Sequence, residues 1–401
     1  MLKKSESIKI GLISTLVVLA ILCAVVFSKK SSQYNKKHDS RILSTWDIDM
    51  TPQKKNIASW PSFVKKDDAM YIFNSGIIFK WDYKSTSYRP ACDDPACDHQ
   101  TDECPATFSP DKYESVTYYN DHWIFVEKDV DKRYYLGYCD FDGKNRKRVL
   151  DISDDIQGAA PLLYIDCIGE KIYVRYNSSV SVQDESGWNS AERACIIKYD
   201  VSLISSGKAY SEKVFLCDDK DNNVVHVLFI DDERFVVDVP GTGDGIEKYR
   251  DCRIYNQEDS SYITVESARD AFMLSDGRYV AQKKEGLMLV DGDKTIRLDE
   301  GGWGVSYWDD NRIYVINRFG RQIASEDKNG VIPDGEVRVY DYDGNLVDRV
   351  YLPKNYSLID NIAAYDGRYY MTSIDFGTRS YFYAYDTQNP DKGWKKINRG
   401  Y

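Results

Sequence analysis

The 401-residue sequence is poor in proline, histidine and positive charge. These shortages restrict the fold classes and the binding partners that can be expected. It contains 11 prolines and 4 histidines beside 32 tyrosines, 14 phenylalanines and 8 tryptophans. Aromatic residues at this density favour pleated strands over helices, so an all-β chain is expected. Acidic residues outnumber basic ones by 64 to 53, which leaves no broad positive face to neutralise phosphates. Nucleic acid is therefore not an expected partner.

The sequence also lacks the short motifs that mark common enzymes. It has no Gly-x-Ser-x-Gly elbow, His-Glu-x-x-His pair, Walker loop or Gly-x-Gly-x-x-Gly after a strand. Asp-x-Asp-Gly occurs at 140–143 and 341–344, but neither copy has the glutamate that an EF-hand loop needs at its twelfth position. We interpret both copies as turns, and the sequence predicts no catalytic residue.

Long apolar runs are absent with one exception at the N-terminus. Residues 11–27 carry no charge and are just long enough to span a bilayer. We expect a basic tail at 1–10, a transmembrane helix at 11–27, a polar stalk at 28–45 and the main domain at 46–401. A cleaved signal peptide is the alternative, because lysines precede the apolar run.

The expected location is the cell membrane, with a single span and the C-terminal domain outside the cell. A long C-terminal domain translocates largely regardless of flanking charge. Basic residues after the span outnumber those before it, which by itself would favour the opposite orientation.

Past residue 50, short alternating strands are separated by Asp, Gly and Asn, and no long stretch has apolar residues at helical spacing. A turn of such residues followed by a Tyr- or Val-rich strand occurs at 67–73, 120–125, 169–174, 231–236, 276–280, 310–315 and 366–371. The six intervals span 299 residues, a mean of about 50, and propeller repeats run at about 40 to 50 residues per blade. The sequence therefore predicts a seven-bladed β-propeller, with six or eight blades as alternatives.

Two blade signatures and one cysteine-rich segment give a family resemblance. Asp-Gly-Arg-Tyr occurs at 276–279 and 366–369, Tyr-Asp-Tyr-Asp-Gly at 340–344, and Cys-x4-Cys-x-His-x4-Cys at 92–104. Over residues 50–401 the chain resembles the TolB-like and receptor-type β-propellers of membrane-anchored surface proteins in anaerobic Gram-positive bacteria. The resemblance implies an extracytoplasmic propeller and assigns no activity.

The cysteine-rich segment holds the candidate ligands Cys92, Cys97, His99 and Cys104. Four soft ligands within 13 residues can form a tetrahedral Cys3His zinc site. In such a site the metal stabilises the segment in place of a hydrophobic core. A disulfide between two of the cysteines is the alternative, because an extracellular location favours oxidation. The histidine favours zinc, but the spacing matches no common zinc finger, so both interpretations stay open.

Long insertions are expected on one face of the propeller. If the repeated turn joins the inner strand of a blade to the second strand, the insertions at 92–111, 177–193, 239–251 and 317–336 all fall on the opposite face. Insertions cluster on the binding face of repeat folds. We therefore expect ligand contacts from Trp188, Tyr249 and Phe319.

These features favour a non-enzymatic binding module outside the cell. A saccharide is the first ligand class to test, because flat aromatic rings and polar groups suit sugar faces, and an envelope protein is the other expected partner. One alternative is a polysaccharide-processing hydrolase or lyase that uses loop carboxylates. Another is a structural or sensory ectodomain.

Overall fold

The structure is a computed structural model of the whole chain. It describes residues 40–44, 46, 63–74, 76–85, 87–92, 94, 96–184, 187–219, 226–239, 250–283, 285–299, 304–309, 311–316, 335–352, 358–365, 367–374 and 380–399. These residues are almost all strands and turns, with one short helix α2 (Val201–Ser205) and one 3-10 segment η2 (Pro390–Lys392). The prediction of an all-β chain is confirmed.

The described strands form five four-stranded sheets and one eight-stranded sheet. The eight-stranded sheet consists of the first four and the last four strands of the chain, so the strands group into consecutive four-stranded antiparallel units. The first unit consists of β1 (Phe63–Lys66), β2 (Ala69–Asn74), β3 (Ile77–Asp82) and β4 (Ser87–Pro90). The second consists of β5 (Tyr113–Tyr119), β6 (His122–Lys128), β7 (Tyr134–Asp140) and β8 (Lys147–Asp151). The third consists of β9 (Ala159–Ile168), β10 (Lys171–Asp184), β11 (Gly187–Asp200) and β12 (Ser211–Asp219). In the fourth and fifth units they are β13 (His226–Ile230), β14 (Arg234–Val239), β15 (Asp251–Asn256), β16 (Tyr262–Val265); and β17 (Ala268–Met273), β18 (Tyr279–Lys283), β19 (Gly286–Asp291), β20 (Lys294–Asp299). In the sixth and seventh units they are β21 (Gly304–Trp308), β22 (Arg312–Ile316), β23 (Glu336–Asp341), β24 (Leu346–Tyr351); and β25 (Leu358–Tyr365), β26 (Arg368–Ile374), β27 (Ser380–Asp386), β28 (Trp394–Arg399).

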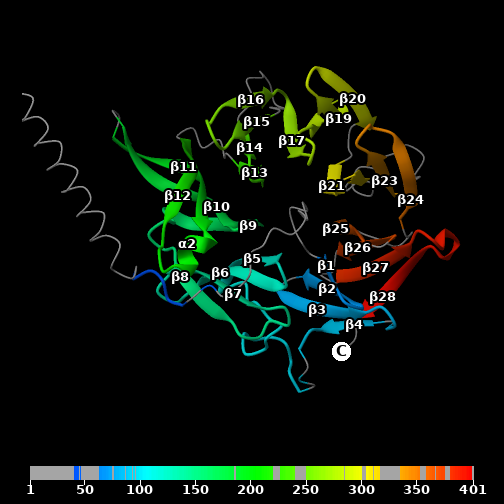
Figure 1. Cartoon of the computed structure of the whole chain (residues 1–401), viewed down its shortest axis with the longest axis horizontal. Helices are drawn as coiled ribbons and strands as arrows, with labels where there is room; N and C mark the ends of the chain where they lie inside the picture. Colours follow the sequence, from blue (N-terminus) through cyan, green and yellow to red (C-terminus); the bar gives the residue numbers. More distant parts are fainter. Residues whose placement is uncertain are drawn as a thin grey trace, which may run out of the picture.

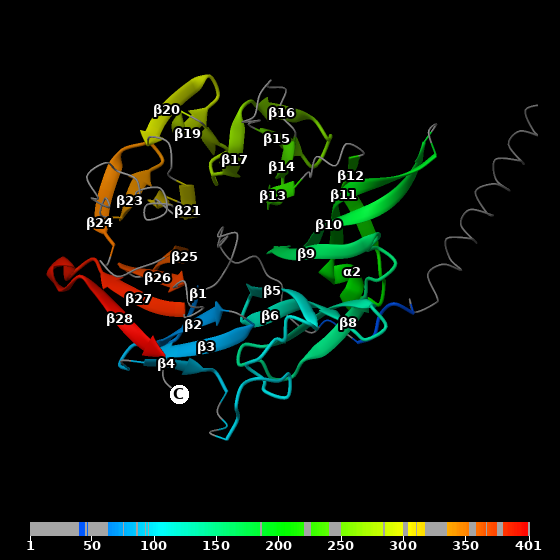
Figure 2. The same cartoon turned by 180° about the vertical axis from the view of Figure 1, so that it is seen from behind.

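The units follow one another around a common centre, with their first strands on the inside and their fourth strands on the outside (Figures 1 and 2). The ring closes where the outer strand β4 of the first unit pairs in parallel with the outer strand β28 of the last. Antiparallel sheets repeated radially around an axis define a β-propeller. The fold is a β-propeller.

The repeated turn joins the first and second strands of each unit. Its acidic residues bind the backbone: Oδ1 of Asp231 accepts hydrogen bonds from the amides of Glu233 at 2.8 Å and Arg234 at 2.6 Å. Oδ1 of Asp309 likewise accepts the amide of Arg312 at 2.8 Å. Such acceptors favour a turn over a continued strand. We call the face with these turns the turn face, and the opposite face, with the second-to-third-strand and unit-to-unit connections, the insertion face.

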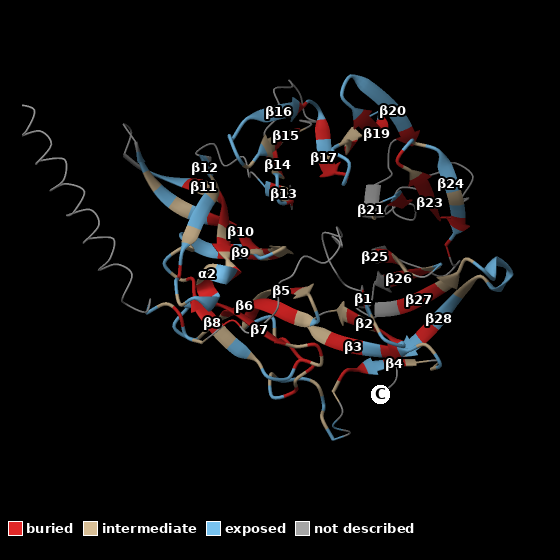
Figure 3. Cartoon of the chain, in the orientation of Figure 1, coloured by how far each residue is buried: buried red, intermediate tan, exposed pale blue. Residues whose placement is uncertain are grey.

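Hydrophobic clusters lie between neighbouring units. The first and second units share one cluster, and the second and third share another. Further clusters join the third unit to the fourth, the fourth to the fifth and sixth, and the sixth and seventh to the first. Large aromatic side chains fill them, and Trp123, Tyr173, Tyr314 and Phe382 are almost fully buried. Figure 3 shows buried positions along the sheets of successive units. Since each cluster draws on at least two units, a single unit cannot bury its own faces.

The first described residues bind to the outside of the second unit, beside β8 (Figure 1). Ile42 pairs with Leu150, and the side chain of Trp46 is buried with its ring centre 5.3 Å from that of Tyr138. Residues 40–44, which the sequence analysis places in the stalk, thus contact the domain.

The predicted basic tail at 1–10 and transmembrane helix at 11–27 lie outside the described residues. Within the part of the chain that is described, no helix has the length and apolar character needed to cross a bilayer. The membrane anchor stays a prediction.

Candidate metal centre

The four predicted ligands lie in the connection between β4 and β5, which joins the first unit to the second. Acidic side chains turn this segment locally. Oδ1 of Asp94 accepts the amide of Ala96 at 2.9 Å, and Oδ1 of Asp98 accepts that of Gln100 at 3.1 Å. Within the second turn His99 has a left-handed backbone with φ of 55°, which is uncommon for a residue other than glycine. The chain therefore bends sharply between the ligand positions.

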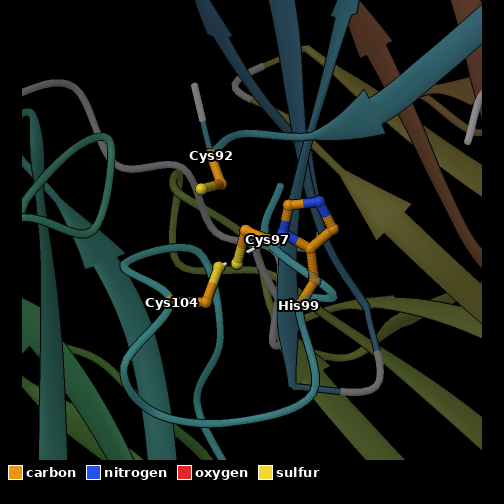
Figure 4. Close-up of side chains that lie close together, drawn as sticks. All are labelled: Cys92, Cys97, His99 and Cys104. Atoms are coloured by element: carbon orange, nitrogen blue, oxygen red, sulfur yellow. Dashed lines mark hydrogen bonds between the residues drawn. The ribbon is translucent and has the colours of Figure 1, made fainter. Parts of the chain in front are cut away.

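The turns bring all four predicted ligands together. The ligand atoms of Cys92, Cys97, His99 and Cys104 lie within 4.8 Å of one another. Nδ1 of His99 is 3.3 Å from Sγ of Cys104, and the imidazole presents this nitrogen toward the sulfurs (Figure 4). With Zn–S bonds of about 2.3 Å, the sulfurs of a tetrahedral site are about 3.8 Å apart. The donor set therefore fits a zinc ion in both chemistry and spacing.

The three loop cysteines are free thiols in the structure. Cys104 is buried, whereas Cys92, Cys97 and His99 are partly exposed. Cys139 of β7 belongs to the same hydrophobic cluster but is fully buried, and burial raises the pKa of its thiol to about 12. A thiol of that kind is an inert small hydrophobe. Cys139 is therefore not a candidate ligand, and the candidate group holds only the three loop cysteines and His99.

Backbone hydrogen bonds hold the loop against the first unit. The amide of Ile78 in β3 donates to the carbonyl oxygen of Ala106 at 2.8 Å. The amide of Phe108 donates to the carbonyl oxygen of Gly76 at 2.6 Å. Because β4 ends at Pro90, residues 106–108 take its place beside the beginning of β3.

Arg146, in the β7–β8 connection, ties the same loop to the second unit. Its Nη2 donates to the carbonyl oxygens of Pro105 and Thr107, at 2.6 Å each. Its guanidinium carbon is 4.2 Å from the ring centre of Phe108. Gly143 of that connection has φ of 81°, and a Cβ there would lie 1.8 Å from the Pro105 oxygen. From the sequence, residues 140–143 are predicted only as a turn, and the glycine is the one signal there for this contact.

Ion pairs extend from the loop into the second unit. Nζ of Lys112 is 3.7 Å from Oδ2 of Asp102 and 3.2 Å from Oε1 of Glu127. Arg148 donates to the Glu127 carboxylate from Nε at 3.0 Å and from Nη2 at 2.7 Å. Burial alone would raise the pKa of Glu127, but the Arg148 hydrogen bonds and the Lys112 charge outweigh it and lower that pKa. Glu127 is therefore an ionised anchor beneath the loop.

Comparison with known proteins finds only distant similarity in structure and leaves the activity open. No family model matches the chain, and no curated protein matches its sequence. An acylaminoacyl peptidase structure is 12% identical over 85% of this chain and 52% of its own, with a TM-score of 0.49. A puromycin hydrolase is 10% identical over 88% and 57%, with a TM-score of 0.49. The β-propeller domain of the Trilobed protease from Pyrococcus furiosus is 13% identical over 85% and 98%, with a TM-score of 0.44. The chain thus spans about half the length of the first two proteins, and the family resemblance seen in the sequence stays a prediction.

The described residues that flank or form the predicted insertions belong to second-to-third-strand and unit-to-unit connections, which are on the insertion face. The insertion at 177–193 is a long hairpin, in which β10 and β11 stay paired from Asn177 with Ala194 to Asp184 with Gly187. Of the three predicted ligand contacts, Trp188 belongs to β11 but its side chain lies outside the described residues. The other two, Tyr249 and Phe319, lie outside them entirely, so these three ligand contacts stay a prediction.

A pocket of about 220 Å³ opens on the described part of the insertion face, beside the cysteine loop. Its walls include Phe73 and Phe108 from the first unit and the loop, and Tyr113, Leu163 and Tyr164 from the next two units. The rings of Phe73 and Phe108 meet edge to face with centres 5.8 Å apart. The loop that carries the candidate metal ligands therefore also forms one wall of a pocket lined by aromatic rings.

Proposed function

We propose that the protein is a membrane-anchored, extracytoplasmic propeller of seven blades that binds a ligand or partner and contains one structural zinc ion. The observation that carries the proposal is the convergence of three cysteine sulfurs and one histidine nitrogen within 4.8 Å. Sites in which four protein ligands complete a tetrahedron are structural, because no position is left for water or substrate.

The surroundings of the cluster support a structural role. Residues 104–108 bind β3 of the first unit and Arg146 of the second, so a metal that closes this loop would connect two blades. Metal binding of this kind adds directly to the free energy of folding. Each blade packs on its neighbours, and the loop is the link between the first two.

The insertion-face pocket beside the loop supports a binding role. Aromatic walls on a rigid scaffold are typical of recognition sites. A saccharide is the first ligand class to test there, and an envelope protein is the other. A glycan and peptidoglycan array, run beside an assay for released reducing ends, tests this binding role. Binding without release supports the binding module, and release supports the alternative of a polysaccharide-processing enzyme.

Metal analysis of the purified full-length chain tests the zinc site. We expect about one zinc per chain, and His99→Ala should lower metal retention because it removes one of four ligands. His122→Ala is the matched control, since Nδ1 of His122 is 2.8 Å from the carbonyl oxygen of Asn120 in a turn outside the loop. A chelator should expose the three loop thiols to a thiol reagent.

Two results would contradict the zinc site. An intact mass lowered by the hydrogens lost on oxidation, with a loop loosened by reductant and indifferent to chelator, would establish the disulfide. Metal-free protein whose three loop thiols react under native conditions would make the segment an ordinary surface loop.

A further inference from the structure

A second cavity, of about 650 Å³, lies on the turn face between the sixth and seventh units. It is on the opposite side of the propeller from the predicted insertions and within the size range of ligand sites. The beginnings of β22 and β26, which belong to these two adjacent units, supply much of its wall. Asp309, Arg312, Tyr314, Asp348, Arg368 and Tyr369 all line it.

Two phenol–carboxylate pairs are among the residues that line this groove. The hydroxyl of Tyr314 donates to Oδ2 of Asp309 at 3.1 Å, and that of Tyr369 donates to Oδ2 of Asp348 at 2.5 Å. The two rings meet edge to face with centres 5.8 Å apart. Burial first, and then the neighbouring carboxylates, raise the pKa of both phenols, so the hydroxyls stay protonated. The carboxylates are thus held in place and each retains further acceptor capacity.

The arginines of the groove occupy a position that recurs around the ring, at or just before the second strand of a unit. The recurring residues are Arg234, Arg278, Arg312 and Arg368. Nη1 of Arg234 donates to the carbonyl oxygen of Gly277 in the next unit at 3.4 Å. Nη1 of Arg278 is 3.9 Å from Oδ1 of Asp343, also in the next unit. Arg312 lies at the same kind of junction and lines the open groove.

Among the described residues that line the groove, the charged ones are two aspartates and two arginines, so the formal charges of this described set cancel. A hydroxyl group can accept from a guanidinium and donate to a carboxylate, whereas an amine only donates and a carboxylate only accepts. The rings of Tyr314 and Tyr369 are buried, so apolar surface for the C–H face of a sugar ring would come from the partly exposed Tyr365, which also lines the groove. We propose that this turn-face groove binds a neutral oligosaccharide of a few sugar units, at a site separate from the insertion face.

Calorimetry on the purified full-length chain tests this site with cellotriose, maltotriose and triacetylchitotriose, and with trigalacturonate as the anionic comparison. We expect one of the neutral trisaccharides to bind and Arg312→Gln to weaken it at least about tenfold, because a charge-assisted hydrogen bond is lost. Arg278→Gln is the matched control, since it changes the equivalent arginine of a junction that does not line the groove.

Several results would overturn the site. One is failure of all three neutral sugars to bind at about 5 mM. Tighter binding of trigalacturonate than of the neutral sugars is another, and an equal loss of affinity in both arginine variants is a third. Tyr164→Ala separates the two faces, because this side chain lines only the insertion-face pocket among the two cavities described. Binding that Tyr164→Ala removes and Arg312→Gln spares would support the proposed function and refute the groove.

Discussion

Replacing Phe382 by alanine would test how the propeller closes. Phe382 lies in β27 of the last unit and is 1% exposed. Its ring centre is 5.2 Å from that of Trp81 and 6.0 Å from that of Tyr88, both in the first unit. The backbone pairing of β4 with β28 is short by comparison, with two residue pairs among the described strands. We infer that side-chain packing, more than backbone pairing, stabilises the junction between the first and last units.

The size of the effect follows from the burial of this ring. Removing a buried phenylalanine costs about 3 to 5 kcal/mol. Each of the two aromatic contacts across the closure contributes about 0.5 to 1.5 kcal/mol beyond its buried area, so about 1 to 3 kcal/mol is specific to the junction. Domains of ordinary stability have about 5 to 15 kcal/mol in total. The variant should therefore lose a large share of its free energy of unfolding.

Urea unfolding followed by tryptophan fluorescence measures the loss, and limited proteolysis locates it. Phe235→Ala is the matched control, because Phe235 is 2% exposed and packs on other aromatic rings away from the closure. Both variants should be destabilised, but only Phe382→Ala should increase cleavage within the first and last units. A loss below about 1 kcal/mol, or the same cleavage pattern in both variants, would refute closure by side-chain packing.

Three further predictions concern the loop, its ion pairs and the anchor. Because the folded-state pKa of Glu127 is lowered, its ionisation stabilises the fold above the ordinary pKa of 4.5 and the gain is lost as pH falls through the folded-state value. Glu127→Gln should therefore be less stable than the parent protein near neutral pH, and the two stabilities should converge in acid. Thermal melting across this pH range checks it, and a constant difference between the two proteins would contradict it. Arg146→Lys should cost about 1 to 3 kcal/mol and speed hydrogen exchange in residues 104–108, since lysine lacks the planar fork that binds two carbonyls; unchanged exchange there, with Arg193→Lys as the control, would show that the contact is dispensable. Protease added to intact cells should digest the domain at 46–401 while membrane-bound fragments remain, and protection until lysis would reverse the predicted orientation.

Local chemistry explains how much of the fold could be predicted. Turn residues and alternating strands are encoded within about ten residues, so the repeated turn could be located in every unit before the strand order was known. The four candidate ligands could be found in the same way, because 13 residues with internal acidic turns can converge without help from the rest of the chain. The sequence by itself thus determined the all-β class, the period of the repeat and the ligand set.

Contacts between distant residues were decided only by the tertiary structure. Arg146 binds the carbonyl of Pro105 from another unit, and β4 meets β28 from the opposite end of the domain. The turn-face groove is lined by residues of two adjacent units. The local sequence does not identify these partners, because each contact joins residues that are far apart in the chain. A repeat sequence encodes each unit, but the differences between junctions arise only when the units pack around the ring.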